Sequence, residues 1–205
     1  MEKNLSMSPQ LLPTKKLKVV GFDPSLRNWG IAVGHLWLQD NRHLEVNFLD
    51  IVQPELPKSK QIRQNSLDLE TARLLSEGAL KHLTDVDAVF VEVPVGSQSA
   101  RAMASYGVCV GILGAIRAMG IPFFEVSPEE VKRVAVGTKI ATKAQMINWA
   151  VSKYPDINWP TCKNKGVPQV VASKAEHMAD AIAAIHAGIS CQPFQQLLSM
   201  IKTTS

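Results

Sequence analysis

Residues 17–38, LKVVGFDPSLRNWGIAVGHLWL, decide the fold, because they hold two apolar runs separated by a short polar turn. The runs, residues 17–22 and 29–38, are rich in the β-branched and aromatic residues that strands favour. Two such runs joined by a short turn predict a β-hairpin. The alternating segment 44–52 adds a third strand, so the chain is expected to begin with an antiparallel meander.

Strands and helices alternate after this meander. Apolar residues at helical spacing predict helices over residues 62–83 and 97–119. Short apolar runs at residues 88–91 and 121–126 predict two buried strands. Three meander strands followed by β-α-β units are typical of one mixed sheet with helices against its faces. The predicted fold class is therefore α/β, with a five-stranded mixed sheet flanked by helices.

Capping signals mark three further helices. Ser127 and Thr142 each precede a glutamate or glutamine by three residues, which is the spacing of a capping box. Ser173 has the same relation to Glu176 and predicts a long helix that reaches about residue 188. Residues 154–167, rich in Pro, Asn and Lys, are expected to form a loop.

Composition and segment boundaries predict one domain. The 205 residues, 46% hydrophobic and 20% charged, suffice for one α/β core. Residues 1–16 are expected to be a flexible leader, 17–190 the domain and 191–205 a C-terminal tail. Three scattered cysteines, with no apolar signal segment and no membrane-length apolar run, favour a cytoplasmic or other reducing intracellular compartment. The net charge of +4 permits a polyanionic partner.

Two carboxylates end apolar strands. Asp23 and Glu92 each follow a buried run, and a divalent cation is a natural way to neutralise a carboxylate in such a low-dielectric cleft. Ligand sites in α/β sheets also gather at strand ends. The alternative for Asp23 is that it simply starts the turn with Pro24 and Ser25. The alternative for Glu92 is a solvated strand end.

A histidine and an aspartate follow on the last long helix. His177 and Asp180 are three residues apart, so their side chains share one helix face and can bind one metal together. His177 alone would more often be an ordinary surface or core histidine. Glu176 ranks below both, because a capping pair with Ser173 would explain it.

A basic stretch surrounds these positions. Between residues 131 and 175 the only acidic residue is Asp156, and such a stretch suits a phosphate backbone. The basic residues of the stretch are Lys132, Arg133, Lys139, Lys143, Lys153, Lys163, Lys165 and Lys174.

These motifs, in their order and spacing, resemble the RuvC family of Holliday-junction resolvases over residues 17–188. Gly21-Phe22-Asp23-Pro24-Ser25 with Trp29-Gly30 resembles the first catalytic strand, and Val91-Glu92 with residues 96–107 resembles the second block. Segments 131–137 and 142–145 resemble the basic region between blocks. Residues 176–183 resemble the last helix, where the family carries a carboxylate or a histidine three residues before an aspartate.

The resemblance implies an RNase H-like fold and the activity of a crossover junction endodeoxyribonuclease, a hydrolase of DNA recombination and repair. Asp23, Glu92, His177 and Asp180 would form one metal site. Two Mg²⁺ ions would straddle the scissile phosphate, one activating a water and one stabilising the leaving 3′ oxygen. Products would carry 5′ phosphate and 3′ hydroxyl ends. Mn²⁺ is an alternative ion, because histidine is a softer ligand than a carboxylate.

The resemblance also implies contacts to branched DNA. Lys132 and Lys143 match family lysines near the scissile strand, where they would stabilise transition-state charge; the alternative is an ordinary solvated helix residue. Further DNA contacts are expected from Arg133, Lys139 and Arg101. Family members form homodimers, which places two active sites on the two symmetric strands of a four-way junction.

One departure and several rival functions remain. The family's aromatic wedge after the second block is replaced by Val95 and Gly96, which leaves Tyr106 as a candidate for strand separation. RNA–DNA hybrids, structured RNA or flap DNA are alternative substrates, since the metal residues do not distinguish them. An actin-like ATPase would need a second domain for which the chain has no room. A non-catalytic branched-DNA-binding protein would be favoured only if a metal ligand were missing.

Overall fold

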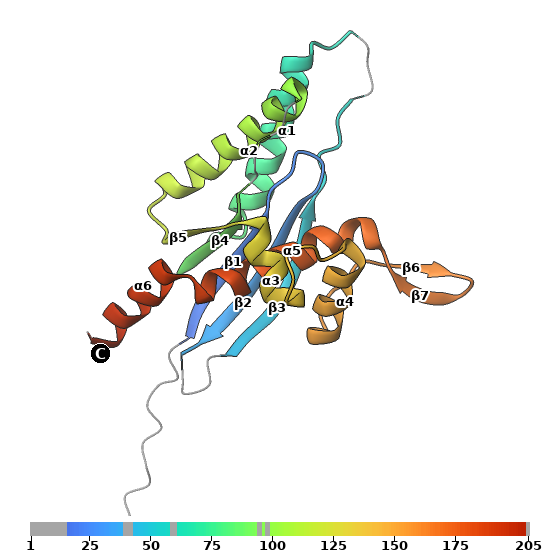
Figure 1. Cartoon of the computed structure of the whole chain (residues 1–205). Coiled ribbons are helices and arrows are strands. Elements are labelled where there is room, and N and C mark those ends of the chain that lie inside the picture. Colours follow the sequence, from blue (N-terminus) through green and yellow to red (C-terminus); the bar gives the residue numbers. More distant parts are fainter. Residues whose placement is uncertain (1–15, 39–42, 58–60, 94–95, 97–98, 204–205) are drawn as a thin grey trace, which may run out of the picture.

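The computed structural model describes residues 16–38, 43–57, 61–93, 96 and 99–203 (Figure 1). Five strands form one sheet: β1 (Lys16–Asp23), β2 (Trp29–Trp37), β3 (His43–Val52), β4 (Ala88–Glu92) and β5 (Phe123–Val126). Their spatial order is β3-β2-β1-β4-β5. The meander β1-β2-β3 is antiparallel, whereas β4 pairs parallel with β1 and β5 pairs parallel with β4. The predicted α/β class with a five-stranded mixed sheet is confirmed.

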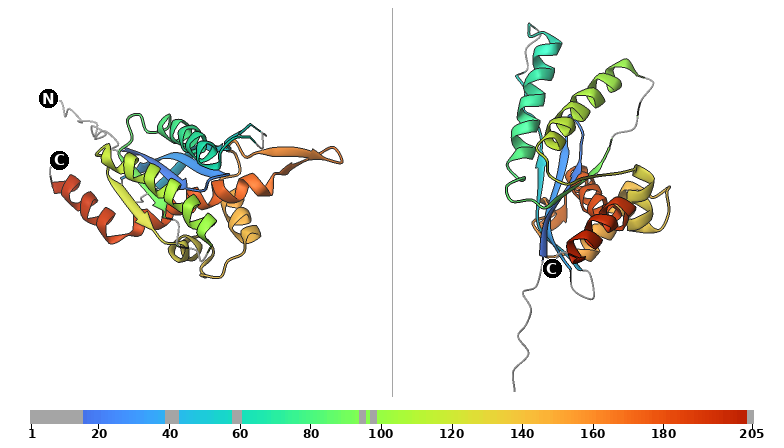
Figure 2. Two further views of the ribbon diagram at one scale, coloured as in Figure 1. Left: turned by 90° about the horizontal axis from the view of Figure 1, so that it is seen from above. Right: turned by 90° about the vertical axis from the view of Figure 1, so that its left-hand side faces the viewer.

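The described part of the chain has six helices: α1 (Gln64–Leu80), α2 (Ala100–Ala118), α3 (Pro128–Val136), α4 (Lys143–Lys153), α5 (Ala172–Ser190) and α6 (Gln192–Thr203). Helices α1 and α2 cover one face of the sheet, and α5 covers the other with α3, α4 and α6 around it (Figure 2). This arrangement follows from strands that are apolar on both faces, because each face must be shielded from water.

Helix α5 lies closest to the sheet. A Cβ atom added to Gly30 would lie 2.1 Å from the carbonyl oxygen of His177, so the helix backbone rests directly on β2 at this point. Gly30 is paired with Asp23 across the β1–β2 ladder. Because Gly30 has no side chain, the first half of α5 can lie next to the end of β1.

The capping boxes of α3 and α4 are confirmed, with Ser127 and Thr142 each accepting from the backbone N–H three residues on. The predicted cap of α5 at Ser173 is wrong. The helix begins at Ala172 after Val171, and no side chain caps it. Glu176 does not fold back onto Ser173, because its carboxylate bonds to Lys143 of α4.

Two segments hold more regular structure than the sequence predicts. Strand β6 (Thr161–Asn164) lies within the expected loop 154–167 and pairs antiparallel with β7 (Val167–Val170), which begins at the last residue of that loop. Within the expected tail, α6 buries Phe194 and Leu198 in the core, where Phe194 contacts the rings of Phe90 and Phe124. Of the expected leader, only Lys16 is among the described residues, and it begins β1. Within the described residues, no helix combines the length and apolar character needed to cross a bilayer.

A buried histidine makes fold stability depend on pH. Burial, with a smaller effect from Lys153, lowers the pKa of His186 to about 4, and its Nε2 lies 2.7 Å from the Tyr154 hydroxyl. The unfolded chain takes up a proton near pH 6.5, whereas the folded chain does so only near pH 4. We expect the contribution of His186 to the free energy of unfolding to fall by about 3 kcal/mol as the pH drops through this window. Denaturant titrations of wild type and His186→Gln at several pH values measure it as the difference between the two profiles, which should change steadily between about pH 6.5 and about pH 4; parallel profiles would refute the assignment.

Candidate active site

The candidate site lies where β1 and β4 end beside the first half of α5. Asp23 is the last residue of β1 and Glu92 the last residue of β4. The two strands are parallel neighbours, so both carboxylates reach the same edge of the sheet. Helix α5 brings His177 and Asp180 to this edge. The site thus combines residues that are up to 157 positions apart in sequence.

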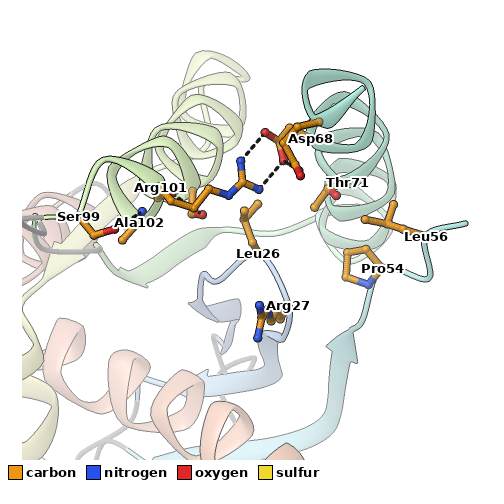
Figure 3. A pocket seen from close by; sticks show the side chains of 11 residues that line it. Leu26, Arg27, Pro54, Leu56, Asp68, Thr71, Ser99, Arg101 and Ala102 are labelled. Atoms are coloured by element: carbon orange, nitrogen blue, oxygen red, sulfur yellow. Dashed lines mark hydrogen bonds and ion pairs between the residues drawn. The ribbon is translucent and has the colours of Figure 1, made fainter. Parts of the chain in front are cut away.

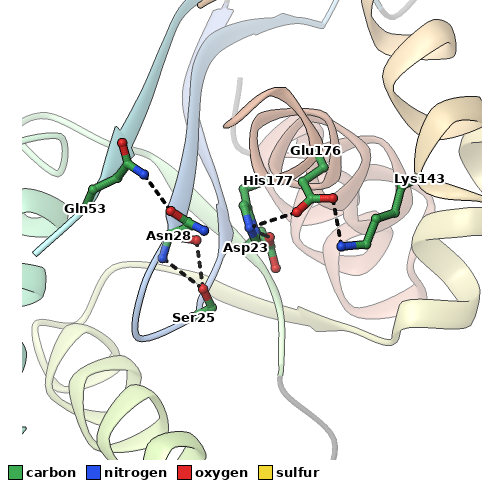
Figure 4. Close-up of polar contacts among 7 residues, drawn as sticks. All are labelled: Asp23, Ser25, Asn28, Gln53, Lys143, Glu176 and His177. Carbon is green, nitrogen blue, oxygen red and sulfur yellow. Dashed lines mark hydrogen bonds and ion pairs between the residues drawn. The ribbon is translucent and has the colours of Figure 1, made fainter. Parts of the chain in front are cut away.

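A chain of polar contacts connects four of the side chains (Figure 4). His177 Nδ1 lies 2.6 Å from Asp23 Oδ2, and His177 Nε2 lies 3.4 Å from Glu176 Oε1. Lys143 Nζ donates to Glu176 Oε2 at 2.8 Å. A carboxylate only accepts hydrogen bonds, so the imidazole is the donor to Asp23. Asp23, Glu176 and His177 are less than one-fifth exposed, whereas the Lys143 side chain is 80% exposed.

Negative charge is crowded at this edge. Burial and the charge of Asp23 raise the pKa of Glu92 to about 7, and Lys132 opposes the shift. Burial and the charges of Asp23 and Glu92 also raise the pKa of Asp180. Both shifts arise because an ionised carboxylate is costly in a buried place that already holds another. A bound cation would remove that cost.

The pKa of His177 is also raised, which for an imidazole favours the charged form. Burial lowers the pKa of His177, but the hydrogen bond and charge of Asp23, with Glu176 and Asp180 nearby, raise it overall. A metal ion bound through His177 would therefore have to compete with a proton for the imidazole. Among the described residues, no three His, Cys, Asp or Glu side chains already surround one point as an ion cage.

The donor set fits a divalent metal in its chemistry. Three half-buried carboxylates, Asp23, Glu92 and Asp180, offer the oxygen ligands that hard divalent ions prefer, and His177 offers one nitrogen. The sheet and α5 fix the backbones of these four residues. Rotation of their side chains would therefore have to bring the ligand atoms together around an ion. The raised pKa of Glu92 and of Asp180 marks the charge that such an ion would neutralise.

The structure brings together six of the predicted residues and leaves others apart. Lys132 acts electrostatically on Glu92, and Lys143 acts on Glu176, Asp180 and Asp23. Arg133 instead lies on the exposed side of α3 and Lys139 in the turn that follows it, each about 4 Å from Glu129. Of the basic residues predicted near the site, Lys132 and Lys143 thus lie within electrostatic reach of the carboxylates.

Arg101 lies apart from the carboxylates. It makes a bidentate ion pair with Asp68 of α1, at 2.7 and 2.8 Å (Figure 3). Its neighbours line a cavity of about 610 Å³ between α1, α2 and the β1–β2 turn. A second cavity, of about 400 Å³, is lined by Tyr106, Lys143 and His177. Arg27 lines both, so the two hollows adjoin at the β1–β2 turn.

Tyr106 therefore lies beside the candidate site. Of the two residues at the expected wedge position, Val95 is outside the described residues and Gly96 has no side chain to insert.

Two features of the site were missed from the sequence. Glu176 links His177 to Lys143, and its spacing of four from Asp180 could have indicated a shared helix face. Ser25 holds the β1–β2 turn: its hydroxyl accepts from the Asn28 N–H at 3.1 Å and donates to the Asn28 carbonyl at 2.9 Å. This turn fixes the backbone directly after Asp23.

The chain was compared with known proteins. No family model matches the sequence. The chain is 25% identical over 173 residues to the crossover junction endodeoxyribonuclease RuvC of Carboxydothermus hydrogenoformans, a match that covers 84% of this chain and 95% of that protein.

The fold is similar to those of solved Holliday junction resolvases. Thermus thermophilus RuvC matches with a TM-score of 0.59 and 19% identity, over 89% of this chain and 97% of that one. T. thermophilus RuvC in complex with Holliday junction substrate matches with a TM-score of 0.56 and 19% identity, over 88% and 96%. The yeast mitochondrial Holliday junction resolvase Ydc2 matches with a TM-score of 0.52 and 13% identity, over 96% and 89%. The resemblance to the RuvC family and the RNase H-like fold are confirmed.

Proposed function

We propose that this chain, which resembles RuvC in sequence and in fold, is a metal-dependent endonuclease that resolves four-way junctions and related branched DNA. The observation that carries the proposal is the crowding of Asp23, Glu92 and Asp180 beside His177, at the edge where β1 and β4 end. Carboxylates crowded together in this way destabilise the folded protein, and a role in binding divalent ions would explain why they are there.

Divalent metal ions, Mg²⁺ or Mn²⁺, would be held by Asp23, Glu92, His177 and Asp180. When bound, they would lower the pKa of an attacking water and neutralise charge on the scissile phosphate. The protein fixes the ligands on two strands and one helix, so the groups that must act together are held on rigid elements. Hydrolysis would leave a 5′ phosphate and a 3′ hydroxyl.

The two lysines would act on the phosphate from the open side of the site. Lys143 is exposed, and its ammonium can leave Glu176 to contact a non-bridging oxygen while its backbone stays at the start of α4. The charge of Lys132 opposes the rise in the pKa of Glu92, so it acts at the same edge of the sheet. Positive charge aimed at a phosphate stabilises the extra negative charge of the transition state.

Cleavage of a substrate panel tests the function. Labelled four-way junction, flap, RNA–DNA hybrid and linear duplex are incubated with the full-length protein in Mg²⁺ or in Mn²⁺. We expect paired, symmetric nicks in the junction and little cutting of the duplex. Cutting of the hybrid or the flap alone would change the substrate class. Junction binding without cutting of any substrate would favour the non-catalytic alternative.

A homodimer is part of this proposal, because two linked sites could cut two strands of one junction. Helix α2 offers a surface for it: Met103 and Val110 are each nearly half exposed, and small residues lie between and beyond them. We expect Gly111→Glu to shift the protein from dimer to monomer in sedimentation velocity at micromolar concentration.

The monomer fold should survive this substitution, because nothing lies within 4 Å of a Cβ atom at Gly111. Circular dichroism and thermal unfolding of the variant are the control. A wild-type chain that sediments only as a monomer, with and without junction DNA, would contradict the dimer.

A further inference from the structure

A two-stranded ribbon projects from the body of the protein beside the candidate site. Strands β6 and β7 extend beyond the other elements in two perpendicular views (Figures 1 and 2). All side chains of the two strands are exposed except Val170, which is half-buried. Two exposed strands have no core of their own, so packing alone does not account for this ribbon.

We propose that the β6–β7 ribbon is a contact for a duplex arm of the DNA substrate, holding its phosphate backbone outside the cutting site. The inference rests on the proposed function, because it assigns the ribbon to the same substrate. It would favour junctions over linear duplex, since a branched substrate sends an arm past the ribbon while another strand lies in the site.

The charge of the ribbon fits a phosphate backbone. Lys163 and Lys165 lie on it and Lys174 follows at its base, while residues 157–175 contain no acidic side chain. Neither Lys163 nor Lys165 makes an ion pair within the described part of the protein. Their charge is therefore available to a partner, and uncompensated lysines on one projection are typical of nucleic-acid contacts.

At the tip of the ribbon, Lys165 has a backbone conformation that other residue types adopt more readily. Lys165 and Gly166 both have positive φ, 49° and 84°, which is the pattern of a type I′ turn. Asparagine or glycine adopts the first position of that turn more readily than lysine. The chain thus carries a positive charge at its outermost point in spite of a conformational cost.

A protein strand is a poorer occupant than DNA. Pro168 lies inside β7 and has no backbone N–H, which interrupts the hydrogen-bond ladder that an added strand would need. The one large apolar side chain with high exposure on the ribbon is Val167, too little for an apolar interface. A two-stranded ribbon also has the width that the major groove of DNA admits.

The base of the ribbon is held firmly next to the site. The Val171 N–H donates to the Pro160 carbonyl at 2.8 Å, and Trp159 is buried in the core. Helix α5 starts one residue later, so His177 lies roughly 8 Å along its axis from the ribbon base. Four residues per strand add roughly 13 Å of reach. The tip could meet DNA about six base pairs from the cut, at ~3.4 Å per pair.

The test removes the charge without disturbing the ribbon. Lys163→Gln with Lys165→Asn deletes two charges, and Asn-Gly is a favourable type I′ turn, so the hairpin should persist. Lys16→Gln with Lys18→Gln is the matched control, which removes two charges from the start of β1, at the end of the sheet opposite Asp23. All variants also carry Asp23→Asn to prevent cutting, and binding to fluorescent junction and duplex is followed by anisotropy over a range of salt concentrations.

We expect the ribbon variant to bind the junction roughly tenfold more weakly at about 0.1 M salt, with a salt slope reduced by about 1.8. The control pair should retain both values. An unchanged slope in the ribbon variant, or an equal loss in the control, would overturn the proposal. Binding is measured without catalysis, so it tests the ribbon separately from the nuclease activity. A protein that cuts no substrate would refute the proposed nuclease but would leave the binding test of the ribbon valid.

Position on the DNA gives a second readout. Cys162 is exposed on the ribbon, so a thiol-reactive photo-crosslinker can be attached there in a Cys191→Ser background, in which the buried Cys109 is the one other cysteine of the sequence. We expect crosslinks to the helical arms of the junction, several base pairs from the crossover. Crosslinks confined to the crossover nucleotides would overturn the assignment of the ribbon to an arm.

Discussion

Asp23→Asn should lower the single-turnover rate of junction cleavage roughly a thousandfold or more, while junction binding is kept. Asp23 is the residue that the other site groups share: its carboxylate contacts His177 and raises the pKa of both Glu92 and Asp180. An amide has the same shape but no charge, so it would be a much weaker ligand for a divalent ion. Rates are measured at saturating enzyme in Mg²⁺ and again in Mn²⁺.

The matched control is Asp156→Asn, the same chemical change at an exposed position of the basic stretch. It should cut at the wild-type rate. Binding by Asp23→Asn should be equal to wild type or tighter without metal, because one negative charge near the phosphate has gone. Cleavage by Asp23→Asn within tenfold of wild type would show that the site has been assigned wrongly.

Gly30→Ala should lower the free energy of unfolding by about 3 kcal/mol or more and abolish cleavage. The added methyl group would lie 2.1 Å from the carbonyl oxygen of His177 and 2.4 Å from its carbonyl carbon. Neither atom can rotate away, because both belong to the backbone of α5. The helix would have to lift from the sheet, and His177 would then move away from Asp23.

Gly114→Ala is the comparison for this change. It is also a glycine-to-alanine substitution, but a Cβ atom there meets nothing within 4 Å and the residue lies inside α2. It should leave stability unchanged or raise it by up to about 1 kcal/mol. Urea unfolding of both variants and junction cleavage by both are measured. A Gly30→Ala protein with normal stability would mean that α5 does not rest on β2 as described.

The succession of strands and helices could be predicted, and the candidate site residues could be chosen, because both depend on local patterns. Apolar runs that end in Asp23 and Glu92 mark both the strands and the edge where a site can form. Capping boxes at Ser127 and Thr142 set two helix starts, and the structure retains both. The pairing of His177 with Asp180 follows from the helical repeat alone.

The features that were missed depend on distant contacts. Glu176 had two available partners, Ser173 nearby in sequence and Lys143 on another helix, and the second forms the bond. Helix α6 is held by Phe194 against aromatic rings from β4 and β5. Apolar residues at helical spacing in residues 194–201 could have indicated the helix, but not the rings against which it packs. The ion pair of Arg101 with Asp68, 33 positions earlier, was not expected either, and its contact with DNA stays a prediction. Each outcome depends on which elements the fold brings together.

Helix α5 has a consequence for how the protein can change. It buries ten of its residues and also carries His177 and Asp180, so it cannot open unless the whole domain unfolds. Its amide hydrogens near Asp180 should exchange with solvent only through global unfolding, whereas those of the β6–β7 ribbon should exchange far faster. Substitutions in the ribbon can therefore accumulate at little cost to folding, and they can alter which DNA is held without loosening the groups that cut it.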